Sequence, residues 1–128
     1  MQIRALSVAQ PWANLVAEGR KTIETRRWGT PWRGWLLDCA TKERRPYCPG
    51  PYGVALAVAR LVDCRPMTAA DEAAACCALY DGAWAWVLEG VQAFPAGQQF
   101  PVRGQLGLFT AAEIAADWEG GDEDQEEI

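Results

Sequence analysis

Histidine is absent from this 128-residue sequence, and its absence excludes several kinds of active site. Hydrolases that activate a serine or cysteine nucleophile with an imidazole need a histidine. Acid–base chemistry here would have to use lysine, carboxylates, tyrosine or cysteine. No cysteine or carboxylate spacing suggests a zinc site. We therefore expect neither a bound metal nor a cofactor.

The five cysteines do not follow a pattern typical of disulfides or zinc ligands. Their number is odd and no C-x-x-C pair occurs among Cys39, Cys48, Cys64, Cys76 and Cys77, which predicts reduced thiols. No apolar run approaches the ~20 residues that span a bilayer. The first residues also lack the charged and apolar regions of a signal peptide. We expect a cytoplasmic protein without membrane contact, and we favour a monomer.

Basic residues are scarce in the second half of the chain. Residues 1–65 contain eleven basic and five acidic residues, whereas residues 66–128 contain one basic and twelve acidic residues. Seven of those acids lie between positions 117 and 127. The charge pattern predicts one folded domain over 1–116, followed by a disordered acidic tail over 117–128. The net charge of −5 therefore does not exclude an anionic ligand near the basic half.

Tryptophan and basic residues are concentrated in one stretch, residues 6–40. It contains four of the seven tryptophans and five basic residues: Trp12, Trp28, Trp32, Trp35, Arg20, Lys21, Arg26, Arg27 and Arg33. Aromatic faces interleaved with cations suit flat, anionic ligands such as nucleotides. This stretch is the best candidate for a binding site.

Hydrophobic periodicity predicts about six short strands, at 2–8, 21–28, 35–41, 54–64, 83–94 and 102–109. Helices are predicted at 11–18, 69–79 and 110–118. Since helices do not alternate with every strand, we predict an α+β fold, a small mixed β-barrel with two or three helices packed outside. The apolar segment 54–64 should lie in the centre of the sheet. A regular strand over 21–28 would separate Lys21 from Glu24, so the two side chains converge only if its start bends or bulges.

One motif, G-x-K-x-x-E-x-R, is present as Gly19, Lys21, Glu24 and Arg26. The segment QPWA precedes it, and WRGWLLDCA, AWVLEGVQAFP and VRGQLGLF follow in that order. Together these blocks, within residues 6–109, resemble the ASCH domain family, which is similar to the PUA-like superfamily of small β-barrels.

The resemblance implies a cleft between the first helix and the barrel, with the motif residues lining it. It also implies RNA, DNA or a modified base as the ligand. Some small bacterial members of the family are amidohydrolases acting on N4-acetylcytidine, and others are nucleic-acid binders or ribonucleases. This chain departs from the amidohydrolase-like members at Glu24, where they carry threonine.

Lys21 and Glu24 are the candidate catalytic residues. In a partly dry cleft Lys21 would act as base or nucleophile; the alternatives are a phosphate contact or an ion pair with Glu24. Glu24 would accept hydrogen bonds from the edge of a base or act as general acid and base. Its alternative is a structural salt bridge to Lys21 or Arg26.

Six further residues are candidates for ligand binding. Two arginines would hold phosphate, two tryptophans would stack a base, and two polar residues would contribute hydrogen bonds at the rim: Arg26, Arg33, Trp12, Trp28, Ser7 and Gln10. The alternatives are solvated arginines, core tryptophans and a Gln10 that only opens the helix.

Three functions fit these features. The leading interpretation is a domain that binds RNA, single-stranded nucleic acid or a modified nucleoside in a cationic, Trp-lined cleft. The second is a hydrolase on nucleic-acid derivatives, resembling an N4-acylcytidine amidohydrolase or a metal-independent ribonuclease, with Lys21 and Glu24 as its acid–base pair. The third is a protein-interaction adaptor that uses the acidic tail, and it predicts no binding of nucleic acid or nucleoside.

Overall fold

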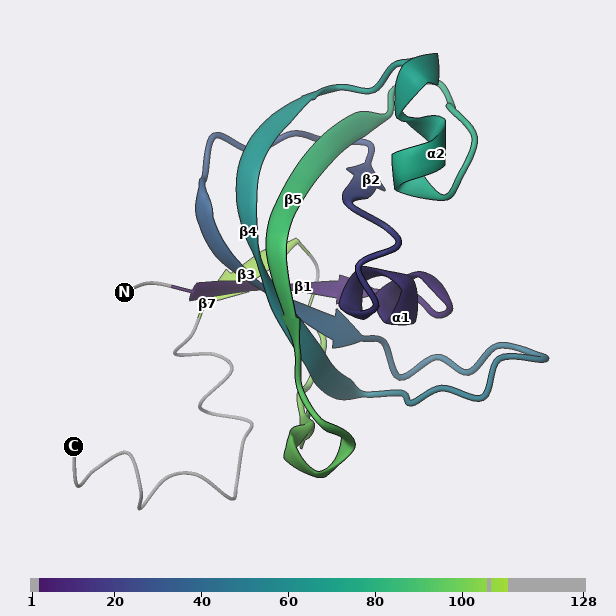
Figure 1. The fold of residues 1–128 in the computed structure, drawn as a ribbon, viewed down its shortest axis with the longest axis vertical. Coiled ribbons are helices and arrows are strands. Elements are labelled where there is room, and N and C mark those ends of the chain that lie inside the picture. Colours follow the sequence, from purple (N-terminus) through teal and green to yellow (C-terminus); the bar gives the residue numbers. More distant parts are fainter. Residues whose placement is uncertain (1–2, 106, 111–128) are drawn as a thin grey trace.

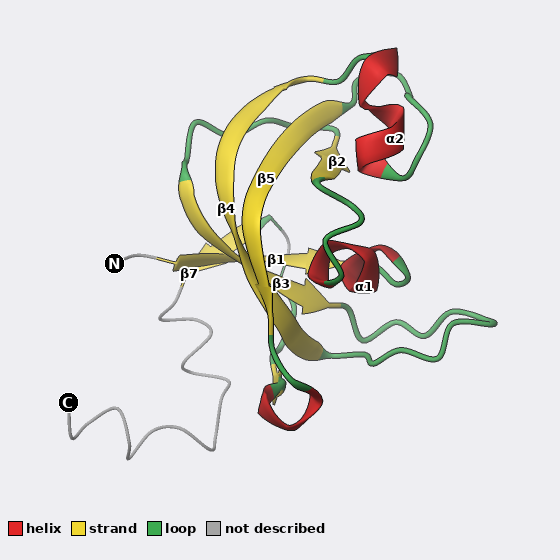
Figure 2. Ribbon diagram, viewed as in Figure 1, coloured by secondary structure: helices red, strands yellow, loops and turns green. Residues whose placement is uncertain are grey.

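One strongly curved sheet forms the centre of the molecule in a computed structural model that describes residues 3–105 and 107–110 (Figure 1). Its strands are β1 (Ile3–Val8), β2 (Ile23–Arg26), β3 (Gly34–Ala40), β4 (Val54–Pro66), β5 (Trp84–Ala93), β6 (Phe100–Pro101) and β7 (Leu108–Thr110). Two short helices lie outside the sheet (Figure 2), α1 (Trp12–Ala17) and α2 (Glu72–Ala75), and 3-10 turns span Ala69–Asp71 and Ala96–Gln98.

The strands follow the order β2-β5-β4-β3-β1-β7, and β6 pairs with β4. The sheet is mixed, because β1 and β3 are parallel whereas the other pairs are antiparallel. The 13-residue β4 lies in the centre, as predicted for 54–64. Curvature makes the sheet a half-barrel, which confirms the predicted α+β fold with a mixed, barrel-like sheet and few helices. The order begins at β2 and ends at β7, so β1 and β2 are not hydrogen-bonded neighbours.

The interior of the half-barrel is apolar and includes Leu6, Leu36, Leu56 and Trp86. Residues paired across neighbouring strands share a face of the sheet. Glu24 pairs with Trp86 and Asp38 pairs with Leu6, so the register directs both carboxyl groups toward this interior. The strand register thus places two acidic residues, Glu24 and Asp38, among residues of the core.

The helix predicted over 69–79 is shorter than expected, because Cys76 adopts a left-handed conformation (φ 55°) that ends α2. A continued helix would bond the Ala75 carbonyl to the Leu79 N–H. Instead the Ala75 carbonyl accepts a hydrogen bond from Lys21 Nζ, and the Leu79 N–H donates to Glu72 Oε2 at 2.7 Å. One side chain from a distant segment, Lys21, and one from the same segment, Glu72, therefore replace the hydrogen bond that would continue the helix.

The strand predicted over 102–109 is also shorter, since only its end forms β7. Gly107 has a φ of +70°, in the left-handed region that an extended strand does not use. The Val102 N–H nonetheless bonds to the Gly53 carbonyl at 3.0 Å. Positions 111–118 of the predicted closing helix and the acidic segment 117–128 lie outside the described residues.

Asp71 stabilises the turn before α2 and predicts a specific pH dependence. Its carboxylate accepts bonds from Arg65 Nη1 and Nη2 at 2.8 and 2.9 Å and from the Thr68 N–H at 2.8 Å. These donors, the Arg65 guanidinium first, hold the pKa of Asp71 well below its ordinary value. Because the folded pKa is depressed, the stabilisation is present above about pH 4, the unfolded value, and is lost as pH falls through the folded value.

We expect Asp71→Asn to lower the midpoint of thermal unfolding at pH 7, with a difference from the wild type that shrinks as pH falls from 5 toward 2. Thermal melts across this range measure it. Glu89→Gln removes an exposed carboxylate and serves as the control. The same pH profile in both variants would contradict the proposed role of Asp71.

Candidate functional site

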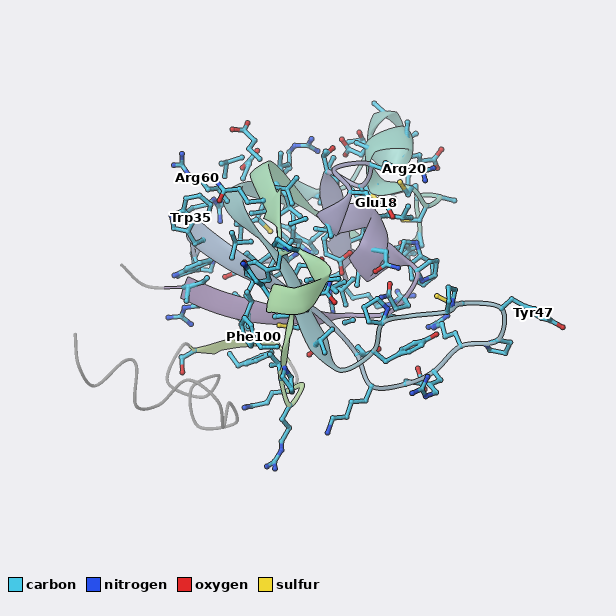
Figure 3. The ribbon with its side chains drawn as sticks, turned by 60° about the horizontal axis from the view of Figure 1, so that its bottom comes forward. Glu18, Arg20, Trp35, Tyr47, Arg60 and Phe100 are labelled. Carbon is cyan, nitrogen blue, oxygen red and sulfur yellow. The ribbon has the colours of Figure 1, made fainter. Side chains whose placement is uncertain are left out.

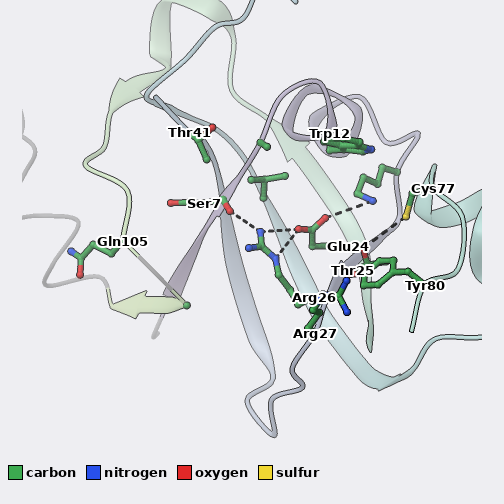
Figure 4. Close-up of a pocket in the computed structure, with 14 residues that line it drawn as sticks. Ser7, Trp12, Glu24, Thr25, Arg26, Arg27, Thr41, Cys77, Tyr80 and Gln105 are labelled. Carbon is green, nitrogen blue, oxygen red and sulfur yellow. Dashed lines mark hydrogen bonds and ion pairs between the residues drawn. The ribbon is translucent and has the colours of Figure 1, made fainter. Parts of the chain in front are cut away.

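A cavity of about 580 Å³ lies between β1 and β2, which are not hydrogen-bonded to each other in the sheet (Figure 4). Its walls come from the end of β1, the start of α1, β2, and the segment that follows α2. The lining residues are Ser7, Val8, Ala9, Trp12, Lys21, Glu24, Thr25, Arg26, Arg27, Thr41, Cys77, Tyr80, Gln105 and Gly107. Five of the eight sequence-predicted site residues are therefore brought together, namely Ser7, Trp12, Lys21, Glu24 and Arg26.

Lys21 and Glu24 converge because Lys21 precedes the regular strand. Helix α1 ends before Gly19, whose φ of +79° is a conformation that favours glycine. The N–H groups of Arg20 and Lys21 both bond to the Leu15 carbonyl at 3.0 Å, which turns the chain before β2 begins at Ile23. The buried Lys21 Nζ then donates to the Ala75 carbonyl and lies 3.6 Å from Glu24 Oε1. The two side chains therefore meet the condition stated for this segment, since the chain turns before the regular strand begins.

Arg26 joins Glu24 to the opposite side of the cavity. Its Nε donates to Glu24 Oε2 at 2.9 Å, and its Nη2 lies 2.8 Å from the same oxygen and donates to the Ser7 carbonyl at 2.6 Å. Arg26 thus connects β2 to β1 where the sheet has no backbone pairing. Glu24 Oε1 remains able to accept a bond from a ligand, since 3.6 Å from Lys21 Nζ exceeds a hydrogen bond.

Ser7 contributes its carbonyl rather than its hydroxyl to this chain of contacts. In Figure 4 its side chain points away from Arg26 and Glu24. The buried Ser7 Oγ has no hydrogen-bond partner among the described residues. Gly104 lies so close that a Cβ built there would meet Ser7 Oγ at 2.8 Å. The hydroxyl therefore faces the segment around Gly104.

Two aromatic rings line the cavity together with arginines. Trp12 lies under the Arg45 guanidinium, 5.3 Å from its ring centroid, and Tyr80 lies under Arg27 at 5.0 Å. Arg27 also donates to the Asp81 carbonyl at 2.8 Å. The cavity thus combines stacking surfaces, cationic donors and the Glu24 carboxylate.

Three of the residues predicted to bind a ligand do not line this cavity. Gln10 is buried and donates to the Pro51 carbonyl at 2.7 Å and to Asn14 Oδ1 at 2.9 Å. Trp28 packs edge-to-face on Trp86 with the ring centroids 4.8 Å apart. Arg33 donates to the Thr30 and Trp32 carbonyls in its own turn. These three side chains form packing contacts or hydrogen bonds within the protein.

Sequence reasoning missed several residues that the fold brings to the site. Tyr80 and Cys77 come from the segment after α2, where Cys77 Sγ lies 3.8 Å from Thr25 Oγ1. Nothing local in the sequence marks them. Asp38 could have been found, since it is the one charged residue in the otherwise apolar β3.

Asp38 is buried behind the site, and neither carboxyl oxygen has a hydrogen-bond partner among the described residues. Burial first, and then the charge of Glu24, raises the pKa of Asp38 well above its ordinary value. A carboxyl group without partners in an apolar interior favours the neutral form. Asp38 therefore adds a second carboxyl near Glu24 without adding a stable charge.

Comparison with protein families identifies the fold. The family model described as "ASCH domain" matches residues 6–98. The chain belongs to the ASCH domain family. Segments of two curated proteins, both named Activating signal cointegrator 1, from human and mouse, are 51% identical over 39 residues. That match covers 30% of this ASCH chain and only 7% of each relative's length.

Solved structures share the ASCH fold. The ASCH protein of Zymomonas mobilis superposes with a TM-score of 0.57 at 17% identity, covering 97% of this chain and 92% of that one. Its Y47F variant gives a TM-score of 0.58 at 16% identity, with 98% and 96% covered. At this identity the likeness concerns the fold. Within the described part of this chain, no helix has the length and apolar character required to cross a membrane.

Proposed function

We propose that this ASCH domain binds a base of single-stranded nucleic acid or of a modified nucleoside in the cavity between β1 and β2. The observation that carries the proposal is the chain of contacts from Lys21 through Glu24 to Arg26, placed on the wall of a cavity that Trp12 and Tyr80 also line. A volume of about 580 Å³ is in the range of small-molecule sites.

Each group offers a contact that suits a nucleotide. Glu24 Oε1 can accept a hydrogen bond from an exocyclic amino group, such as that of cytosine. Trp12 and Tyr80 offer faces on which a base can stack. Arg27, at the exposed side of the cavity, supplies a cation for a phosphate. Arg26 is already committed to Glu24 and to the Ser7 carbonyl, so it positions Glu24 instead of binding phosphate.

Hydrolysis of a nucleic-acid derivative is the second candidate, because two buried titratable groups, Lys21 and Glu24, lie side by side in the cavity. Their contacts support binding better. Lys21 Nζ lies between the Glu24 carboxylate and the Ala75 carbonyl, and Glu24 forms a hydrogen bond and an ion pair with Arg26. These contacts engage both side chains with partners in the protein, which suits a fixed hydrogen-bond acceptor for a ligand.

A pair of tryptophan substitutions tests where the base binds. Trp12→Leu removes a cavity-lining ring, and we expect it to weaken binding of a short single-stranded oligonucleotide by about tenfold, since stacking contributes ~1–3 kcal/mol per base. Trp28→Leu is the matched control, because Trp28 is 39% exposed and lies outside the cavity. Fluorescence anisotropy of a labelled oligonucleotide gives both affinities. Equal losses in the two variants would contradict the assignment of the cavity.

Turnover separates the two candidate functions. The protein is incubated with RNA and with a panel of modified cytidines that includes N4-acetylcytidine, and the products are analysed by mass spectrometry. We expect binding without conversion. Conversion that Lys21→Met abolishes would establish the hydrolase instead. Absence of binding to every oligonucleotide and nucleoside would reject both.

A further inference from the structure

The connection between β3 and β4 forms a basic arm, residues 42–53. It projects beyond α1 (Figure 1), and Figure 3 shows Tyr47 at its tip, pointing away from the body of the protein. Tyr47 is fully exposed, and the arm's four charged residues are also exposed: Lys42, Glu43, Arg44 and Arg45. Neither Arg44 nor Arg45 forms an ion pair with a carboxylate among the described residues.

Hydrogen bonds to α1 and within the arm hold it in place. Gln10 Nε2 donates to the Pro51 carbonyl at 2.7 Å, and Asn14 Nδ2 donates to the Gly50 carbonyl at 3.0 Å. Tyr52 Oη donates to the Cys48 carbonyl at 2.5 Å and accepts from the Arg45 N–H at 3.1 Å. The arm is therefore built into the fold, and its cations are presented in fixed places. Preorganisation of this kind lowers the cost of binding.

A groove of about 480 Å³ separates the arm from α1. Its lining residues are Pro11, Asn14, Leu15, Glu18, Arg20, Arg45, Pro46, Tyr47, Cys48 and Pro49. The groove meets the cavity at Trp12, because Trp12 lines the cavity while the groove-lining Arg45 lies over the Trp12 ring. Thr41, at the base of the arm, also lines the cavity.

We propose that this groove is a second nucleotide subsite, so that the ligand is a single strand and not a free nucleoside. The inference rests on the proposed function of the cavity. With one base in the cavity, the sugar–phosphate backbone passes Trp12 onto Arg45, which lines the groove, and Tyr47 stacks a neighbouring base. Arg44, the neighbour of Arg45 on the arm, supplies a second cation beside the groove. Exposed arginines that have no carboxylate partner in the described part of the chain, beside a cavity lined by aromatic rings, match a polyanion that carries flat rings.

Affinity as a function of strand length tests the second subsite. The full chain is titrated with cytidine monophosphate and with oligocytidylates of two, four and eight nucleotides, at several salt concentrations. We expect at least about a tenfold gain between one and four nucleotides, from stacking on Tyr47 and contacts to phosphate. Arg44→Gln should lower the slope of log K against log salt by about 0.7, the value for one phosphate contact on a single strand.

Matched variants locate the effect on the arm. Arg60→Gln is the control for Arg44→Gln, because both arginines are exposed and lie over aromatic rings, Arg60 at 5.9 Å from Trp35 and Arg44 at 5.1 Å from Tyr52. Tyr47→Ala should reduce the affinity for four nucleotides at least about fivefold and leave that for the mononucleotide unchanged. All these side chains are exposed, so the substitutions should not disturb the fold. Circular dichroism of each variant provides the check.

The outcomes distinguish failure of the arm from failure of the cavity. Equal affinity for one and for eight nucleotides, with no effect of Arg44→Gln, would overturn the second subsite and leave the proposed function standing. Absence of binding to every nucleotide would overturn both. Binding of an acidic peptide that Arg44→Gln abolishes, without binding of oligonucleotides, would also overturn the proposal.

Discussion

Replacing Glu24 with glutamine is expected to reduce the free energy of unfolding by about 3–5 kcal/mol, the usual cost of removing one partner from a buried ion pair. Lys21 is only 2% exposed, and Glu24 is its only carboxylate partner among the described residues. Glutamine preserves the shape of the side chain but leaves the ammonium group uncompensated. Chemical denaturation with urea at pH 7 measures the loss.

Removing the lysine should cost less than removing the glutamate. In Lys21→Met the glutamate keeps its hydrogen bond and ion pair with Arg26, so its charge remains paired. The double variant Lys21→Met/Glu24→Gln removes both charges, and we expect it to be more stable than Glu24→Gln. A double-mutant cycle built from these variants measures the coupling energy of the pair.

Glu18→Gln provides the control for a surface ion pair. Glu18 and Arg20 are 3.7 Å apart and both exposed, so this change should alter stability by less than about 1 kcal/mol. A small effect of Glu24→Gln, similar to that of Glu18→Gln, would mean that Lys21 does not depend on Glu24. The folded state would then tolerate Lys21 by another route.

Asp38→Asn is expected to make the protein more stable relative to the wild type as pH rises above about 4, the pKa of an unfolded aspartate. Burial raises the pKa of Asp38 in the folded protein, so between the unfolded and folded values the native state binds more protons. Wild-type stability therefore falls as pH rises through this window, and levels off above the folded pKa. Asparagine does not titrate, so its advantage should grow by as much as about 1.4 kcal/mol per pH unit.

Urea denaturation of both proteins at pH 4, 5, 6, 7 and 8 measures this difference. Asp81→Asn, at an exposed position, should show no such trend and serves as the control. Glu24→Gln in the same series should flatten the wild-type profile, since the charge of Glu24 contributes to the raised pKa of Asp38. Parallel profiles for Asp38→Asn and the wild type would show that Asp38 finds a partner in the folded protein.

Local sequence patterns correctly predicted several elements of the fold. The Trp12, Leu15, Val16 spacing and Gly19 predicted a short helix ending where α1 ends, and the uninterrupted apolar segment 54–64 predicted the central strand. These patterns report how each segment buries one face. The helix predicted over 69–79 was too long. The chain leaves the helix at Cys76, and the Ala75 carbonyl accepts a hydrogen bond from Lys21, which lies 54 positions away in the sequence.

In the candidate site, too, residues close together in the sequence were predicted better than residues that only the fold brings together. The motif itself brought Lys21, Glu24 and Arg26 together, because they lie within six consecutive residues and need only the bend before β2. Trp12 was an expected cavity residue, whereas Trp28 and Trp35 lie elsewhere, the latter on Arg60. Composition shows that tryptophans are near cations, but it does not show which rings the core takes.

By itself, the sequence determined the family, the kind of sheet and the charged motif, since each depends on contacts between near neighbours or on the period of apolar residues. Only the tertiary structure decided that Tyr80 and Cys77 join the cavity, that Asp38 is buried near Glu24 with no hydrogen-bond partner among the described residues, and that Gln10 bonds to the arm. Cys77 lies 52 positions from its contact Thr25, and Gln10 lies 41 positions from its contact Pro51. These contacts exist only after the curved sheet has brought the segments together, and no local pattern encodes that closure.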